Sequence, residues 1–251
     1  NRLYLMAMAR IAARRARRII AVSAYTADEI ARLLNVERER IDVIYHGVNP
    51  IFRPLPPEEV AEFRRRRGLP ERLILCVGTL EPRKNHTKLI EAFARIYHND
   101  VKLALIGAKG WLFDEIFAKI ESLGLNDAVI FPGYVDNEEL PLWYNAATLF
   151  AYPSLYEGFG MPAAEAQSCG TPVLTSNTTS LPEATGEAAL MVEPNSVEAI
   201  AAGMERLLKD ELLWQTLRER GIEHASQFTW ARTARQTTHT YQTALRERGQ
   251  T

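Results

Sequence analysis

The chain has 251 residues, of which 47% are hydrophobic and 24% are charged, a composition typical of globular proteins and not of disordered or fibrous ones. Its 30 basic and 31 acidic residues nearly cancel, which argues against a nucleic-acid partner, because proteins that bind polyanions carry an excess of positive charge. No apolar segment approaches the roughly 20 residues that span a bilayer. Cys76 and Cys169 stand in apolar stretches, as buried thiols do in a reducing compartment. We therefore expect a cytoplasmic protein.

The first 50 residues predict only part of an α/β domain. Residues 18–23 and 41–45 have the composition of strands, and a helix capped at Thr26 stands between them. Two strands and one helix cannot bury a core alone. The chain also begins with Asn and has no signal-peptide pattern, so we expect the interior of a longer protein.

A basic stretch precedes the first predicted strand. We interpret it as the solvated face of a helix, with contact to anionic lipids as the alternative. Its arginines are Arg10, Arg14, Arg15, Arg17 and Arg18.

A proline-rich stretch marks a boundary near residue 50. Gly47 and the four prolines at 50, 54, 56 and 57 stand close together, a density typical of linkers. The arginines at 64–67 then close a helix before Gly68, where cations favour the helix C-terminus, and we assign them no functional role.

From about residue 70 onward, short apolar runs alternate with helical patterns. The runs are nearly continuous in hydrophobicity, which is typical of parallel strands covered on both faces. They are residues 73–77, 102–106, 128–131, 148–152, 172–175 and 189–192. This alternation predicts an α/β fold with a doubly wound parallel sheet, since a closed barrel would need about eight such units.

Capping residues predict where the helices between these runs begin and end. Asn85 precedes one helix, Asp136 or Asn137 a second, and Asn195 with Ser196 a third. Pro162 suits the first turn of a fourth helix, and Gly170 suits the position just after its end.

Two segments that follow predicted strands contain residues suited to binding phosphate. Ligands of open α/β sheets bind beyond the carboxyl ends of the strands. After the first run, Gly78 gives a tight exit, and Arg83 and Lys84 stand before a helix. After the fourth run, the amides of residues 158–161 stand at a helix start, where they and the helix dipole form an anion site. Together these groups predict a diphosphate site.

Two carboxylates belong to the second of these segments. Glu157 precedes the helix, and Glu165 lies one turn inside it with its side chain leaning back toward the helix start. A carboxylate accepts hydrogen bonds from neighbouring sugar hydroxyls, each contributing ~1.5–3 kcal/mol. One segment can therefore bind a sugar, a phosphate and a second sugar, which is the order of groups in a nucleotide sugar. The alternative is solvated surface, because such carboxylate pairs are common on loops.

The wording of several segments resembles glycosyltransferase family 4. Glu157 and Glu165 resemble the E-x7-E motif of retaining glycosyltransferases, and GTLEPRKN resembles the phosphate-contacting loop of that family. PSLYEGFGMPAAEAQSCGTPVLTS, FPGYVDNEELPLWYNAATLFAYPS and FTWARTARQTTHTY resemble its donor segment, its nucleobase-contacting stretch and its closing C-terminal helix. The resemblance covers roughly residues 18–245.

The resemblance implies a role for each matching residue. Arg83 and Lys84 would contact the diphosphate, Glu157 the transferred sugar, and Glu165 the ribose diol. We expect Glu157, Arg83 and Lys84 to be the catalytic set. Among the remaining donor-binding residues that the resemblance implies, Tyr134, Val135 and Leu140 would line the base pocket, and Val135 would act through its backbone. The others are Gly78, Gly158, Phe159, Gly160 and Met161.

The resemblance also implies the architecture and the reaction. The chain would be the C-terminal half of a GT-B glycosyltransferase with paired Rossmann-like domains. Residues 1–50 would be the end of the N-terminal domain, residues 51–228 the nucleotide-sugar-binding domain, and residues 229–251 a helix packing back on the N-terminal part. It would transfer a sugar, with retention, from a nucleoside diphosphate without a metal or other cofactor. Among possible donors, the GTLEPRKN segment weakly favours GDP-mannose.

The sequence departs from the family because most of the N-terminal domain, with its glycine-rich loop, is not in it. That domain would act in cis or in trans, on an unidentified acceptor such as a glycan or a lipid-linked sugar at the inner face of the membrane. The alternative is a module that binds a nucleotide sugar and is inactive alone. A sugar-nucleotide epimerase of the same fold class is a weaker alternative, because GFGMPAAEAQ favours a transferase.

Four aromatic or histidine residues are assigned structural roles. His46 stands at the expected hinge with a local hydrogen bond, and the alternative is an active-site role. His86, in a first helical turn, is expected to be solvated, and the alternative is a position facing the cleft. Trp143 and Tyr144 are expected in the core.

Overall fold

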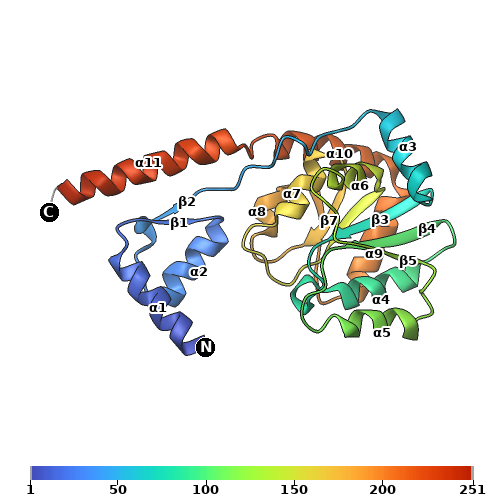
Figure 1. The fold of residues 1–251 in the computed structure, drawn as a ribbon, viewed down its shortest axis with the longest axis horizontal. Helices are drawn as coiled ribbons and strands as arrows, with labels where there is room; N and C mark the ends of the chain where they lie inside the picture. The colour runs from blue at the N-terminus through green and yellow to red at the C-terminus, as the bar shows by residue number, and fades with distance from the viewer. Residues whose placement is uncertain (1, 250–251) are drawn as a thin grey trace. The chain divides into compact units, whose positions relative to one another are not determined.

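The computed structural model describes residues 2–249 and divides into two compact units (Figure 1). The sheet unit comprises Val48–Gln227. The terminal unit comprises the described residues up to Gly47 together with those from Phe228 onward. The sequence predicts boundaries after residues 50 and 228, whereas the structure divides after Gly47 and Gln227.

The terminal unit contains a two-stranded parallel sheet, β1–β2, and a small apolar core. Its elements are α1 (Arg2–Arg15), β1 (Ile19–Ala21), α2 (Ala24–Leu34), η1 (Arg38–Arg40), β2 (Ile41–Val43) and α11 (Trp230–Gly249). The expected cap at Thr26 is wrong. Ser23, in extended conformation, caps α2 by accepting a hydrogen bond from the Thr26 amide at 2.9 Å, so Thr26 lies inside the first turn.

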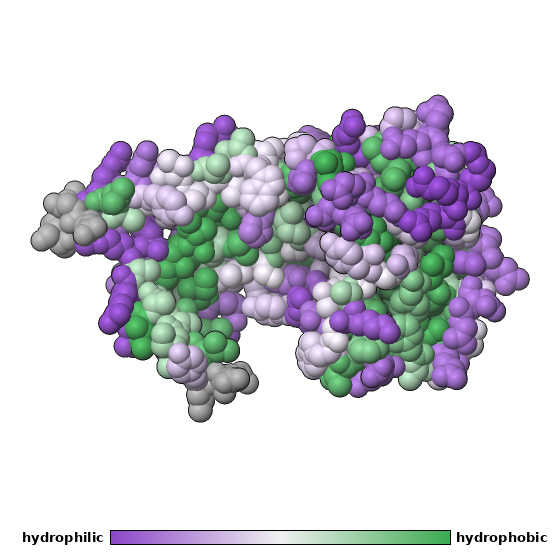
Figure 2. Space-filling model, in the orientation of Figure 1, coloured by the Kyte–Doolittle hydropathy of each residue, from purple (hydrophilic) through white to green (hydrophobic). Residues whose placement is uncertain are grey.

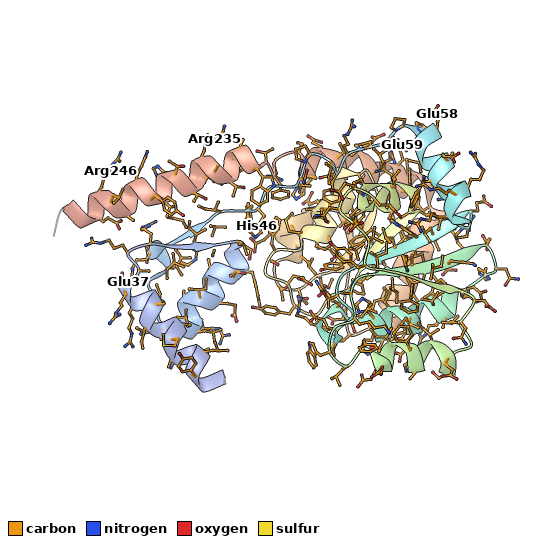
Figure 3. The ribbon with its side chains drawn as sticks, in the orientation of Figure 1. Glu37, His46, Glu58, Glu59, Arg235 and Arg246 are labelled. Carbon is orange, nitrogen blue, oxygen red and sulfur yellow. The ribbon has the colours of Figure 1, made fainter. Side chains whose placement is uncertain are left out.

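Hydrogen bonds connect α11 to the strand side of the terminal unit. Thr240 Oγ1 donates to Asp42 at 2.7 Å, and Thr233 Oγ1 donates to the Tyr45 carbonyl at 2.8 Å. Arg235 and Arg246 lie on the same helix (Figure 3). The His46 ring lies 6.1 Å from that of Trp230, between centroids.

The basic stretch is only partly a solvated helix face. The helix α1 ends at Arg15, so Arg17 and Arg18 follow it, which corrects the single helical stretch that the sequence predicts. Arg18 pairs with Asp42, and Arg17 donates to the Glu247 carbonyl at 2.6 Å. These two arginines are therefore engaged within the unit and not simply solvated.

α1 also has an exposed apolar stripe, and apolar residues gather over this part of the surface in Figure 2. Its exposed members are Tyr4, Leu5, Met8 and Ile11. Within the described residues, no helix combines the length and the apolar composition that crossing a membrane requires.

The sheet unit is built on six parallel strands, which confirms the doubly wound α/β fold. The strand order is β5-β4-β3-β6-β7-β8. The strands are β3 (Arg72–Val77), β4 (Val101–Ile106), β5 (Val129–Gly133), β6 (Leu149–Tyr152), β7 (Val173–Ser176) and β8 (Ala189–Val192). From β3 the chain adds strands in one direction as far as β5, then crosses back to β6 and adds strands in the other. The sheet therefore reverses its winding between β3 and β6.

Helices cover both faces of this sheet. α4 packs against α5 and α9 on one face, whereas α7 packs against α6, α8 and α10 on the other (Figure 1). The helices are α3 (Pro57–Arg67), η2 (Pro82–Lys84), α4 (His86–Ile96), α5 (Asp114–Ser122), α6 (Leu140–Ala146), α7 (Met161–Ser168), α8 (Leu181–Thr185), α9 (Val197–Lys209) and α10 (Glu211–Ala225).

The largest core side chains of the sheet unit include Trp143 and Tyr144, which confirms that both are core residues. The rings of Tyr144, Phe150 and Tyr152 follow one another with centroids 5.4 and 5.5 Å apart. Cys76 and Cys169 are free and buried, as expected. Burial raises the pKa of the Cys76 thiol to about 12.

Some helix boundaries agree with the expected caps, and others do not. Ser196 caps α9 by accepting from the Ala199 amide at 3.1 Å, and Gly68 ends α3 in the left-handed conformation. Glu58 and Glu59 occupy the first turn of α3 (Figure 3), where carboxylates are favourable.

One expected helix start is wrong, and another is confirmed although its expected side-chain cap is not made: α4 begins at His86, directly after Asn85. Asn85 makes no side-chain cap to α4, because its buried amide group instead donates to the carbonyls of Pro153 at 3.0 Å and Pro194 at 2.7 Å. α6 begins at Leu140 and not directly after Asp136 or Asn137, because the intervening residues form a turn.

Candidate functional site

The two segments that the sequence singles out follow neighbouring strands. β3 and β6 lie side by side, with Ile74 opposite Leu149 and Leu75 opposite Phe150. They are the two strands at which the winding of the sheet reverses. Crevices for ligands in open α/β sheets form at this point, outside the carboxyl ends of the strands. The strand order therefore places both segments where such a crevice is expected.

The structure brings Arg83, Lys84 and Glu157 into one cluster, in which Lys84 and Glu157 are buried and Arg83 is partly exposed. Arg83 Nη1 lies 2.8 Å from Glu157 Oε2, and Lys84 Nζ lies 2.7 Å from Glu157 Oε1. The sequence interpretation assigned the two cations to a diphosphate and Glu157 to a sugar. In the structure, the two cations instead pair with Glu157.

Two further side chains complete the cluster, and sequence reasoning missed both. Tyr152 donates its hydroxyl to Glu157 Oε1 at 2.9 Å and accepts a hydrogen bond from Lys84. Ser154 Oγ donates to the same carboxylate oxygen at 2.7 Å. The available signal was their position, since Tyr152 ends β6 and Ser154 follows it on the way to Glu157.

A second carboxylate, Glu81, holds the Arg83 guanidinium and was also missed. Glu81 Oε1 accepts from Arg83 Nε at 3.0 Å and from Nη2 at 2.6 Å. Arg83 Nη1 also donates to the Tyr156 carbonyl at 2.7 Å. Two carboxylates therefore balance two cations, so an entering diphosphate must draw these cations partly away from their present partners.

Glu157 is ionised despite its burial. Burial alone raises the pKa of this carboxyl, but the charge of Lys84, hydrogen bonds from Lys84 and Ser154, and the charge of Arg83 together hold the pKa below its ordinary value. Burial raises the pKa of the Tyr152 hydroxyl, and the neighbouring Glu157 raises it further. Tyr152 is therefore a neutral donor at physiological pH.

The loop after Glu157 is held in a defined orientation by Ser180. Ser180 Oγ donates to the carbonyls of Glu157 at 2.9 Å and Phe159 at 3.0 Å. Because a trans peptide is planar, with its N–H opposite its C=O, the amides of Gly158 and Gly160 point away from Ser180. Their orientation is thus fixed by a buried side chain of a neighbouring element.

Two glycines of the site are required by close packing. Gly160 has φ 109°, and a Cβ there would stand 2.7 Å from Leu181 Cδ2. Met161 then begins α7, with Pro162 in its first turn. A Cβ on Gly78 would stand 3.2 Å from Lys84 Cε, so Gly78 leaves room for the Lys84 side chain.

Glu165 lies apart from this cluster in its hydrogen bonding. It is partly buried on α7, and its Oε2 accepts from the Tyr144 hydroxyl at 3.0 Å. Burial raises the pKa of its carboxyl to about 6, and the hydrogen bond from Tyr144 opposes that shift. Glu165 is therefore close to its titration range at neutral pH.

The three residues expected to line a base pocket differ in exposure. Tyr134 is 71% exposed and Val135 partly exposed, on the loop after the edge strand β5. Leu140 is buried in the first turn of α6, where it contributes to the core.

His86, expected to be solvated, is buried, so that expectation is wrong. His86 begins α4 shortly after η2, and Leu112 and Leu155, from neighbouring loops, line a cavity together with it. A residue in the first turn of a helix is solvated only where no neighbouring loop covers the start of that helix.

Two family models match the chain over adjoining segments. Residues 59–228 match the family described as glycosyl transferases group 1, and residues 1–52 match glycosyltransferase family 4. The chain belongs to the group 1 glycosyl transferases. The first match spans the sheet unit from α3 onward and includes every predicted site residue.

Individual relatives agree with this membership. The chain is 37% identical over 230 residues to O-antigen chain mannosyltransferase B of Escherichia coli, covering 90% of this chain and 60% of that protein. It therefore spans well under two thirds of that relative's length.

Solved structures show the same fold. Sucrose-phosphate synthase of Thermosynechococcus elongatus matches with a TM-score of 0.79 and 30% identity, over 91% of this chain and 58% of that one. The Anabaena protein HepE in complex with UDP and glucose matches with a TM-score of 0.84 and 22% identity, over 95% and 66% of the two chains. The chain thus has the fold of the C-terminal half of a GT-B glycosyltransferase.

Proposed function

We propose that the sheet unit is the donor-binding half of a retaining glycosyltransferase that transfers a hexose from a nucleoside diphosphate. The observation that carries the proposal is the cluster of Arg83, Lys84 and Glu157 at the reversal point of the sheet, beside the first turn of α7. The relatives support the donor class, since one is named a mannosyltransferase and HepE was solved with UDP and glucose. Retention is supported by the resemblance of Glu157 and Glu165 to the E-x7-E motif.

In this proposal the cations act on the departing diphosphate. Arg83 and Lys84 move part of their hydrogen bonding from Glu157 to the phosphate oxygens, and the amides of Gly158 and Gly160 add donors at the start of α7. Donors fixed in place before the reaction stabilise negative charge as it develops on the leaving group. No metal is assigned to this step.

Glu157 binds the transferred sugar through its less crowded oxygen. Oε1 accepts hydrogen bonds from Lys84, Tyr152 and Ser154, whereas Oε2 pairs with Arg83 Nη1. A carboxylate oxygen accepts about two hydrogen bonds. Oε2 therefore retains capacity for a sugar hydroxyl. Glu165 binds the ribose diol, and Tyr134 and Val135 contact the base.

The alternative is that this chain binds the donor but does not turn it over. Retaining transfer requires water to be excluded around the reacting carbon, and one wall of the active site does not achieve that. The second wall, in cis or in trans, would also bring the acceptor. Transfer and donor hydrolysis measured on the chain alone decide between these alternatives.

Nucleotide binding tests the site itself. We expect one of UDP, GDP and ADP to raise the melting temperature, because ligand at a hundredfold excess over Kd adds about 2.7 kcal/mol to stability. By calorimetry, Arg83→Ala should weaken that nucleotide about tenfold, through loss of a charge-assisted hydrogen bond. Arg95→Ala, an exposed arginine on α4, is the control. Unchanged affinity in Arg83→Ala would contradict the site.

A further inference from the structure

The first residue of α4, His86, is a buried histidine whose ring nitrogens find no hydrogen-bond partner among the described residues. His86 is 2% exposed, yet neither Nδ1 nor Nε2 has a partner within the part of the chain that the structure describes. The Glu81 carbonyl is near enough to affect the imidazole but makes no hydrogen bond of normal geometry with it. Buried polar groups are almost always paired, so two unpaired nitrogens on one ring call for a ligand or another explanation.

His86 is a neutral side chain in this position. Burial lowers the pKa of its imidazole to about 4. A neutral imidazole has one nitrogen that donates and one that accepts. It therefore suits a group that can both give and receive a hydrogen bond, as a hydroxyl does.

A cavity of ≈ 140 Å³ lies against His86. Leu112, before α5, and Leu155, in the β6–α7 loop, belong to its lining and are 54% and 38% exposed, so the cavity reaches the surface. Glu81, Thr87 and Glu115 add polar atoms to the lining. The cavity thus combines apolar walls with several hydrogen-bonding groups.

The cavity adjoins the cluster of Arg83, Lys84 and Glu157. Glu81 borders both, because it lines the cavity and accepts two hydrogen bonds from Arg83. Leu155 lines the cavity, and the next residue, Tyr156, gives its carbonyl to Arg83. The cavity and the cluster therefore share the Glu81 side chain as a common boundary.

The lining selects against anions. Arg83 balances the Glu81 carboxylate, but the lining residues include no Lys or Arg and the neutral His86 supplies no charge against Glu115, so a phosphate entering here would find no cation of the cavity's own. Hydroxyl groups instead donate to carboxylates and both donate to and accept from a neutral imidazole, while carbon-bound hydrogens contact the leucines. A neutral polyol matches this combination.

We propose that the cavity at the start of α4 binds hydroxyl groups of the transferred sugar, with His86 as a residue that contacts them and selects among sugars. This rests on the proposed function, because the sugar reaches the cavity only when its diphosphate is held by Arg83 and Lys84. The nucleoside diphosphate alone does not occupy the cavity. Changes in the cavity therefore act on the sugar nucleotide and leave the diphosphate unaffected.

The test compares GDP with GDP-mannose and UDP with UDP-glucose, by calorimetry on the full chain. His86→Phe keeps a buried ring and removes both nitrogens. For whichever nucleotide binds, we expect the sugar nucleotide to lose about fivefold in affinity, the equivalent of one hydrogen bond, while the diphosphate changes less than about twofold. Equal effects on both ligands, or none on either, would overturn the proposal.

A second variant keeps the test decisive if His86→Phe does not fold. Glu115 is exposed on α5, so Glu115→Gln should leave the fold intact. We expect this variant to weaken binding of the sugar nucleotide about threefold and to change binding of the nucleoside diphosphate less. Glu121→Gln, near the other end of α5, is the matched control and should change neither ligand. Absence of all nucleotide binding in the unmodified chain would refute the proposed function itself. Binding of a nucleoside diphosphate and its sugar nucleotide with an unchanged preference in both variants would refute only the cavity.

Discussion

Glu157 and Glu165 lie on one segment, the first just before α7 and the second inside it, yet their surroundings shift their pKa values in opposite directions. Burial raises the pKa of both carboxyls. Glu157 has four side chains that compensate for burial, whereas Glu165 has the Tyr144 hydroxyl. The difference therefore comes from the number and charge of the donors, not from depth.

This contrast suggests different tasks for the two residues. A carboxylate held by two cations and two hydroxyls is fixed in place before a ligand arrives, as an electrostatic site requires. A carboxylate near its titration range carries an uncompensated cost that a ligand can relieve by donating hydrogen bonds. Glu165 is thus suited to receive a diol and Glu157 to organise the cations.

The largest expected effect comes from removing one cation of the Glu157 cluster. Lys84→Met leaves a buried carboxylate with Arg83 as its remaining charged partner, and we expect the free energy of unfolding to fall by about 3 kcal/mol. Urea denaturation followed by circular dichroism measures it. Lys88→Met, on the first turns of α4 and partly exposed, is the control, and we expect a change within about 0.5 kcal/mol. A loss below about 1 kcal/mol for Lys84→Met would show that Arg83 alone compensates Glu157.

An effect of opposite sign is expected at Glu165. Its carboxyl has a pKa of about 6 in the folded chain against 4.5 when exposed, so ionisation costs stability as pH rises from 4.5 through 6. Glu165→Gln removes that cost and should stabilise the chain by about 2 kcal/mol at pH 7 to 8, with no gain near pH 4.5. Thermal denaturation across this pH range measures the difference. A gain that does not vary with pH would contradict the assignment to ionisation.

The same variant separates the proposed roles in binding. Glu165→Gln should weaken a nucleoside diphosphate but not inorganic pyrophosphate, because only the former has a ribose diol. Arg83→Ala should weaken both. If Glu165→Gln weakens pyrophosphate equally, the residue does not act on the ribose.

The sequence predicts the sheet well because the four central strands are buried and the partly buried edge strands β5 and β8 still appear as apolar runs. The sheet unit has six strands where the sequence has six runs, and the last of them, Ala189–Val192, has the same bounds in both. Side-chain caps were less predictable. Asn85 has the residue type of a cap, but its amide bonds to carbonyls distant in the sequence, which no local pattern reveals.

The site was predictable to a similar extent. Charged residues after two strands predicted that Arg83, Lys84 and Glu157 would lie near one ligand, and the structure places them in contact. That they pair with one another, through Tyr152 and Ser154, depends on the adjacency of β3 and β6, and strand order was not fixed by the sequence pattern. Their roles toward a donor remain predictions.

The smallest effect is expected from a matched pair of tyrosine variants that removes one hydroxyl from each carboxylate. Tyr152→Phe removes one hydrogen-bond donor from Glu157 and leaves Lys84, Arg83 and Ser154 in place. Tyr144→Phe removes the hydroxyl that donates to Glu165. Each should lower the free energy of unfolding by about 1 kcal/mol. The pKa values should nevertheless respond differently: that of Glu165 should rise further above 6, while Glu157 should stay ionised at neutral pH, because its cations dominate. Carbon-13 NMR titration of the two carboxyls measures both values, and an equal upward shift in the two variants would show that hydroxyl donors, and not the cations, keep Glu157 ionised.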